Sequence, residues 1–239
     1  MTHDAATGKT IFPGSSTLPP MSFDQVLNFK YLGISLCSSP WRLFHSYNEQ
    51  VKRKAQNYHS SVLSLVKAGP DRSDLAYTLW TRCALPAILY GAEIIPLTQA
   101  TISFVERCQV AVGKFILQIP SSSANAAVYI DAGLKPVWST IAERVLVYAY
   151  TVMGKPSSFW PKMAMNENLK YSSQSPYAKN LLKWKQSTTS LCLPPKQIKA
   201  TIKRAAIIDV LKQQRSTSTT TFAMNGQKIL PFWPDLGLK

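Results

Sequence analysis

Acidic residues are scarce in this chain of 239 residues, which has 12 Asp and Glu against 27 Lys and Arg. The formal net charge is +15 at pH 7. Most of the excess lies in residues 151–239, which hold 14 basic and 3 acidic side chains. Such asymmetry predicts an anionic partner, either nucleic acid or a membrane surface. The alternative interpretation is a protein with an ordinary basic face.

The sequence also lacks the residue spacings of a metal site. The 4 cysteines are far apart and form no C-x-x-C pair, and the 3 histidines add no ligand spacing. We therefore expect no metal and no cofactor. Cys83 and Cys108 are predicted to pack on apolar helix faces, which favours a reducing, intracellular compartment, nuclear or cytoplasmic.

Long apolar runs are missing too. The best candidate, CALPAILYGAEIIPL, is interrupted by Pro86, Gly91 and Glu93. It falls short of the roughly 20 apolar residues that a membrane-spanning helix needs. We therefore expect no membrane partner, whereas a hydrophobic content of 46% is enough for a folded core.

The N-terminal region changes character after about residue 22. Residues 1–22 are rich in Pro, Gly, Ser and Thr, which predicts a loop or frayed end. In the following NFKYLGISL, Phe29 and Tyr31 alternate with Asn28 and Lys30, as in a strand with two unlike faces. Gly33 permits a turn or bulge, so this strand is predicted to be half of a hairpin.

Most of the remaining chain shows helical periodicity. Thr98 is a predicted N-cap, Gly133 a C-terminal cap, and Pro86 is expected to kink or break its helix. Residues 155–180 show no sustained period and are predicted to form a loosely packed connector. In the last helix, Ile198, Ile202, Ala205 and Ile208 are expected to share the apolar face. Helices are predicted over 41–68, 73–97, 99–119, 124–132, 137–153 and 195–215.

The order of several motifs resembles the C-terminal part of the reverse transcriptases of LINE-type, non-LTR retrotransposons. The most specific pieces are FKYLG, and LYGAE followed by Leu97 and Thr98. The resemblance covers about Thr7 to Met153, and its pieces are GKT, FKYLGISL, a helix opening with Trp41, LPAILYGAEIIPLT, VERCQVAVGKFIL and AGLKPVWSTIAERVL.

This resemblance implies a mainly α protein in three parts. Residues 1–36 would be a palm-edge remnant with a short β-hairpin like the primer grip, and residues 37–153 a thumb-like helical bundle. Residues 154–239 would be a basic helical C-terminal extension. Lys9 would be a remnant of the palm lysine that is thought to assist the leaving group in this family.

The catalytic residues of that family do not occur here. Nucleotidyl transfer uses paired Asp carboxylates that hold two metal ions. The chain has no Asp-Asp pair, and Asp4 has no acidic neighbour in sequence. We therefore expect that this chain is not an enzyme by itself and has no polymerase activity.

Two functions stay open on these grounds. In the first, the thumb and extension bind an RNA–DNA hybrid or primed template through nonspecific backbone contacts, and the missing palm of a full-length polymerase is a further candidate partner. In the second, the chain is a helical protein-interaction or structural module, or a relic without selected function. The candidate nucleic-acid-binding residues are Lys30, Tyr31, Gly33, Lys52, Arg53, Lys54, Lys196, Lys199, Lys203 and Arg204.

Two groups of side chains allow another interpretation. Lys52, Arg53 and Lys54 are equally typical of an ordinary solvated helix face. Trp160 and Tyr171 could stack on single-stranded bases, although packing in a core or interface is the favoured interpretation.

Overall fold

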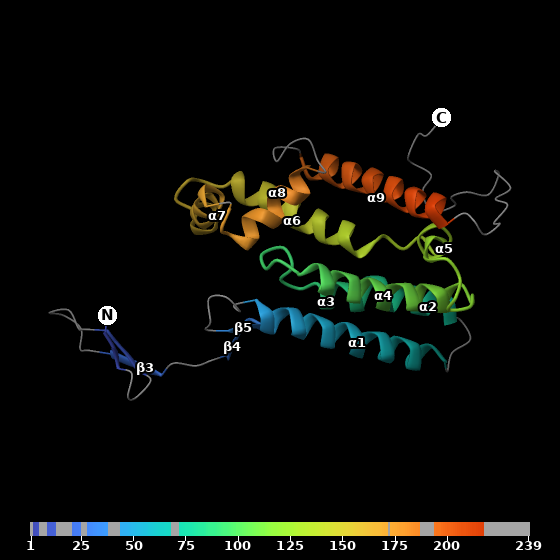
Figure 1. Cartoon of the computed structure of the whole chain (residues 1–239), viewed down its shortest axis with the longest axis horizontal. Helices are drawn as coiled ribbons and strands as arrows, with labels where there is room; N and C mark the ends of the chain where they lie inside the picture. Colours follow the sequence, from blue (N-terminus) through green and yellow to red (C-terminus); the bar gives the residue numbers. More distant parts are fainter. Residues whose placement is uncertain are drawn as a thin grey trace. The chain divides into compact units, whose positions relative to one another are not determined.

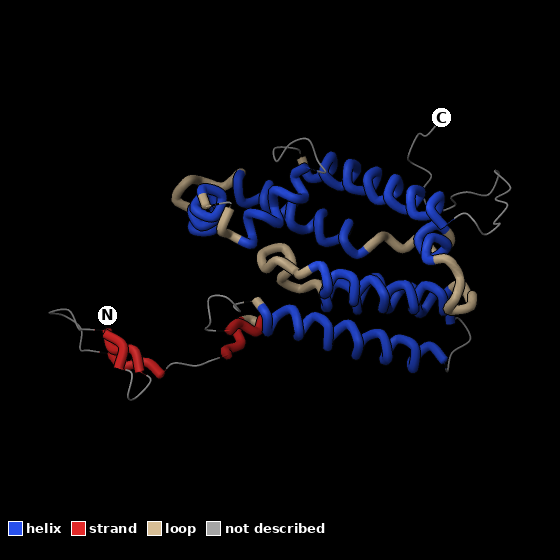
Figure 2. The backbone as a smooth tube through the Cα atoms, viewed as in Figure 1, coloured by secondary structure: helices blue, strands red, loops and turns tan. Residues whose placement is uncertain are grey.

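The protein is described by a computed structural model in which most of the chain is helical, as the sequence predicts (Figures 1 and 2). It divides into two compact units, Met1–Gln50 and Val51–Lys239. The three-part division that the resemblance implies stays a prediction. The described residues are 2–4, 9–12, 21–24, 28–37, 44–67, 72–171, 173–186 and 194–217.

The first unit begins with a small antiparallel sheet where a loop was predicted. Strands β1 (Thr2–Asp4), β2 (Lys9–Phe12) and β3 (Met21–Asp24) pair in the order β1-β2-β3. The loop prediction is wrong for these residues, because strands of three or four residues are too short to show a period among Pro and Gly. Lys9 lies in β2, with Asp4 and Asp24 as its register partners on the two sides.

The predicted hairpin is confirmed. Strands β4 (Asn28–Tyr31) and β5 (Ile34–Cys37) pair antiparallel, and Lys30 lies opposite Ser35. The two turn residues, Leu32 and Gly33, have positive φ values of 47° and 83°. Such a turn matches the right-handed twist of the two strands, and glycine adopts its geometry without steric cost.

The described part of the second unit consists of helices and the loops and turns that join them (Figure 1). Helix α6 packs against α7, α8 and α9, and α4 packs against α2, α5 and α6. Helix α1 begins in the first unit and continues into the second. The elements are α1 (His45–Lys67), α2 (Arg72–Thr78), η2 (Leu79–Ala84), α3 (Leu85–Ile88), α4 (Gln99–Ile116), α5 (Asn125–Ile130), α6 (Val137–Met153), α7 (Trp160–Lys170), α8 (Pro176–Gln186) and α9 (Pro195–Thr217).

Pro86 disturbs its helix, as predicted, but the helix ends earlier than the sequence suggests. The π-helical segment η2 precedes Pro86, which occupies the first turn of α3. Proline removes a backbone donor and crowds the preceding turn, and a π segment is one way in which a helix adjusts locally. The helix stops at Ile88, and Gly91, at φ 89°, takes part in the following turns.

The cap of α4 and the bounds of α6 are also confirmed. The hydroxyl of Thr98 accepts a hydrogen bond from the Thr101 backbone N–H at 3.2 Å, which satisfies a donor at the start of α4. Helix α5 ends earlier than predicted, with Asp131 as its C-cap, so Gly133, at a φ of 65°, lies two residues beyond this C-cap and not in the cap position that was predicted for it. Helix α6 spans Val137–Met153, the range that its apolar period predicts.

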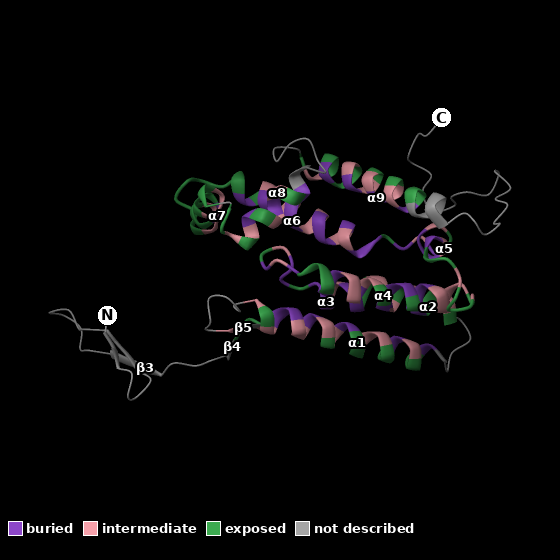
Figure 3. Cartoon of the chain, viewed as in Figure 1, coloured by how far each residue is buried: buried purple, intermediate pink, exposed green. Residues whose placement is uncertain are grey.

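The predicted connector is instead two helices, α7 and α8. Their apolar residues Met165, Ala178, Leu181 and Trp184 are buried. The prediction failed because each helix buries only a narrow part of its surface, and much of α7 faces solvent (Figure 3). The expectation for Cys83 is wrong as well, because its side chain is exposed in η2, whereas Cys108 is buried as predicted.

Gly113 of α4 offers a test of this packing. A Cβ atom at this position would lie 2.2 Å from Cγ1 of Val128 in α5. We expect Gly113→Ala to lower the free energy of unfolding by about 1–3 kcal/mol, the usual cost of overpacking a core. Urea denaturation would measure this change.

Gly154→Ala is the matched control. Gly154 has a φ of −74°, and an added Cβ would meet its nearest atoms at 3.6 and 3.7 Å. The control should therefore keep the stability of the original chain or exceed it by up to about 1 kcal/mol. Equal stability of the two variants would contradict the close packing of α4 on α5.

Candidate nucleic-acid interface

Helix α9 carries four of the basic residues that the sequence singles out. Its apolar side is a row at four-residue steps, Ile198, Ile202, Ala206 and Val210, all of them buried. The prediction that Ile208 belongs to this row is wrong, because 53% of its surface is exposed. Four-residue steps continued through the whole helix leave Ile208 on the opposite side.

The uncovered surface of α9 presents basic residues to solvent at regular intervals, with Arg204 opposite the apolar row and Lys196 and Lys212 on its two flanks. Lys196, Arg204 and Lys212 are exposed and lie eight residues apart, with Ala200 and Ile208 between them. Eight residues make about 2.2 turns, so successive charges are rotated by about 80° around the helix, and the three span about 24 Å along it. We call Lys196, Arg204 and Lys212 the α9 basic row. Sequence reasoning missed Lys212, although the eight-residue spacing was a signal that could have found it.

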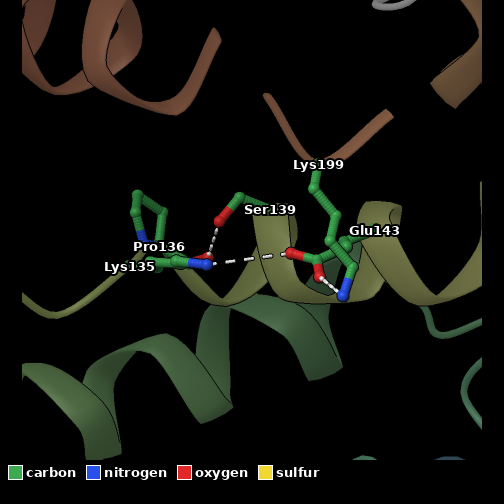
Figure 4. A network of polar contacts seen from close by, with 5 residues as sticks. All are labelled: Lys135, Pro136, Ser139, Glu143 and Lys199. Atoms are coloured by element: carbon green, nitrogen blue, oxygen red, sulfur yellow. Dashed lines mark hydrogen bonds and ion pairs between the residues drawn. The ribbon is translucent and has the colours of Figure 1, made fainter. Parts of the chain in front are cut away.

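Two other predicted residues of α9 have different surroundings. The Nζ of Lys199 lies 3.5 Å from Oε1 of Glu143 in α6, and the Nζ of Lys135 lies 3.7 Å from Oε2 of the same carboxylate (Figure 4). The side chain of Lys199 is more than half exposed, so this pair contributes little to stability. Lys203 is half-buried. Lys196 and Arg204 are thus the predicted α9 residues that present their charge most openly.

The basic triplet of α1 lies elsewhere. Arg53 is exposed, whereas Lys52 and Lys54 are half-buried, and the Nζ of Lys54 donates to the carbonyl oxygen of Ala87 at 3.5 Å. Within the second unit, α1 and α9 lie on opposite sides with other helices between them (Figure 1). Other helices therefore separate α1, which carries the triplet, from α9, which carries the basic row (Figure 1).

The remaining predicted residues belong to the first unit. Lys30 and Gly33 are exposed on the β4–β5 hairpin, and the Gly33 carbonyl oxygen accepts a hydrogen bond from Nε2 of Gln50 at 2.7 Å. The side chains of Lys9 and Tyr31 lie outside the described part of the structure.

A tryptophan of α6 helps to hold α9 in place. Nε1 of Trp138 donates to Oδ2 of Asp209 in α9 at 3.2 Å. The Trp138 ring also stacks on Trp184 of α8, with centroids 5.9 Å apart and planes inclined by 7°. Helices α6, α8 and α9 are joined at this point, so the orientation of the α9 basic row depends on Trp138.

A network of polar groups around α4 supports the start of α6. Glu106 accepts hydrogen bonds from the Tyr129 hydroxyl at 2.6 Å and from the Val137 backbone N–H at 2.7 Å. The adjacent Gln109 is buried; it donates to the carbonyl oxygen of Lys135 at 2.7 Å and accepts from Nε1 of Trp80 at 3.2 Å. These contacts join η2, α4, α5 and the segment that enters α6.

Burial raises the pKa of Glu106, although the hydrogen bonds from Tyr129 and Val137 oppose this change. The negative charge of Asp209 raises the pKa further. Burial also raises the pKa of the Tyr129 hydroxyl, as does the adjacent Glu106 carboxylate.

Comparisons with known proteins return nothing for this chain: no family model, no curated protein and no solved structure matches it. Within the described residues, no cluster of three or more His, Cys, Asp or Glu side chains is arranged to hold a metal ion. None of the described helices combines the length and apolar character needed to span a membrane.

The raised pKa of Glu106 predicts a pH dependence of stability. The folded chain binds this proton more tightly than the unfolded chain, whose ordinary value is 4.5. The contribution of Glu106 to the free energy of unfolding is therefore fully present below that value and is lost as pH rises through the folded pKa. Urea denaturation of the original chain and of Glu106→Gln should show a larger advantage of the original chain at mildly acidic pH than at neutral pH.

Glu167→Gln is the control, because Glu167 is an exposed glutamate of α7 whose loss changes the net charge equally. If the advantage over Glu106→Gln grew toward neutral pH instead, the raised pKa would be refuted.

Proposed function

We propose that this chain is a reverse-transcriptase-like nucleic-acid-binding module, similar to the palm edge and thumb of LINE-type polymerases but without their chemistry. It binds the backbone of an RNA–DNA hybrid or primed template. The observation that carries this proposal is the α9 basic row, in which Lys196, Arg204 and Lys212 are all exposed on the uncovered surface of one helix.

The chemistry of the row suits phosphate groups. Arg204 can donate two parallel hydrogen bonds to one phosphate, and the lysines on either side supply point charges about 12 Å away along the helix. Contacts of this kind position a nucleic acid without reading its sequence. The motif order from FKYLG onward supports the family, and Lys30 on the β4–β5 hairpin is a second candidate contact. The missing palm of a full-length polymerase is a proposed protein partner.

Salt dependence tests the row directly. Binding of a short RNA–DNA hybrid should weaken as salt rises, because bound phosphates release counterions. The triple variant Lys196→Gln, Arg204→Gln, Lys212→Gln should reduce the slope of log affinity against log salt by about 3 if each side chain neutralises one phosphate. Fluorescence anisotropy at several salt concentrations would measure the slope.

The matched control removes three exposed cations elsewhere, with Arg82→Gln, Lys155→Gln and Lys179→Gln. It should change the slope much less. Equal loss in the two triple variants would mean that net charge alone governs binding, and the proposed interface would be wrong. Circular dichroism would establish that both variants are folded.

Glu143 provides a second test with the opposite sign. Its carboxylate lies beside Lys199 and would repel a phosphate approaching α9. Glu143→Gln should therefore tighten hybrid binding at low salt by roughly two- to fivefold, and the gain should fade at high salt. Unchanged or weaker binding would place the interface away from this part of α9.

A second candidate function rests on α7. Phe159, Trp160, Met163 and Tyr171 are exposed large apolar residues at or beside this helix, and Trp160 is 78% exposed. Of the favoured expectation that Trp160 and Tyr171 pack in a core or an interface, core packing is therefore wrong, and packing in an interface stays a prediction. Exposed apolar clusters are typical of protein interaction sites, so a helical interaction module is the alternative. Hybrid binding that does not respond to salt or to the α9 variants would favour it.

A further inference from the structure

A cavity of about 630 Å³ lies between α4, α5, the start of α6 and α8. This volume is in the range of pockets that bind small molecules. None of the residues that line the cavity belongs to α9. The lining combines aromatic rings with basic side chains.

The aromatic part is held in a defined orientation. Trp138 lines the cavity and is half-buried. Its stacking on Trp184 and its hydrogen bond to Asp209 hold the plane of its ring. A planar heteroaromatic ligand could stack on the accessible part of Trp138, and base–aromatic stacking contributes about 1–3 kcal/mol per base.

The charged part favours an anion. Arg107 and Lys183 line the cavity and are exposed; their side chains lie over the rings of Phe104 and Trp184, at 5.5 and 4.9 Å. Neither forms an ion pair with a carboxylate among the described residues. The one carboxylate in the lining, Glu106, already accepts hydrogen bonds from Tyr129 and Val137. Two cations are thus left to meet a ligand.

We propose that this cavity binds one nucleotide, with its base against Trp138 and its phosphate between Arg107 and Lys183. The nucleotide is either free in solution or unstacked from a single strand. In the second case the inference rests on the proposed function and extends it, because the cavity would hold one unstacked nucleotide of a strand whose backbone lies against α9. Binding of a free nucleotide does not depend on that function, so the two can fail separately.

Calorimetric titration with adenosine monophosphate tests the site. We expect saturable binding that weakens at least roughly tenfold in Arg107→Gln, Lys183→Gln, because charge-assisted contacts to the phosphate are lost. Adenosine should bind more weakly than its monophosphate and should respond little to this variant. Both substituted side chains are exposed, so the fold should persist, and thermal denaturation would verify it.

The control is Arg82→Gln, Lys155→Gln, which removes two exposed cations outside both the cavity and the α9 basic row and should leave binding of the monophosphate unchanged. Trp138→Leu tests the base contact and should weaken adenosine and its monophosphate alike. No saturable binding, equal loss in the control, or inorganic phosphate binding as tightly as the monophosphate would overturn the proposal.

Oligonucleotides distinguish the two sources of the nucleotide. If the cavity takes an unstacked nucleotide, Arg107→Gln, Lys183→Gln should weaken binding of a single strand but not of a duplex. If it takes a free nucleotide, the variant should lose the monophosphate and keep both oligonucleotides. Loss of duplex binding alone would assign these cations to backbone contacts and contradict the site.

Discussion

The arrangement of the helical unit depends on two polar side chains of α4, the half-buried Glu106 and the buried Gln109. Glu106 accepts from Tyr129 and Val137, and Gln109 is bonded to Trp80 and Lys135. Buried polar groups without partners are costly, so each bond requires η2, α5 and the start of α6 to keep one position relative to α4. Apolar packing alone would tolerate small shifts of these helices, whereas this network does not.

The hydrogen bonds of Glu106 and Gln109 also determine how the surface of α6, α8 and α9 is positioned. They place Val137 and hence the first turn of α6, where Trp138 reaches Asp209 of α9 and stacks on Trp184 of α8. The α9 basic row and the cavity beside α4 therefore share one support. A change in the α4 network would affect both, although the α9 basic row and the cavity use different cations and are proposed to bind different ligands, a nucleic-acid backbone and a single nucleotide.

The basic side chains that the structure describes do not gather on a single surface. The α1 triplet and the α9 basic row lie on opposite sides of the second unit, and Lys199 is joined to Glu143. A total of +15 attracts an anion from a distance, but only the side chains that remain exposed on one face can contact it closely. Charge counting thus predicts an anionic partner, and the packing of α9 on α6 decides which residues could contact one.

The local sequence by itself determined the mainly helical fold, the bounds of α6, the Thr98 cap and the β4–β5 turn, because these features depend on residues a few positions apart. It could not determine that α7 and α8 form, or that Ile208 of α9 faces outward. The apolar rows of these three helices are narrow and become a buried face only when the helices pack against α6. Nor could the local sequence bring together Arg107, Trp138 and Lys183, which no local spacing connects. Turn geometry and helix capping are determined by residues a few positions apart in the sequence. The cavity and the α9 basic row depend instead on tertiary packing, which decides which helix faces are covered and which stay exposed.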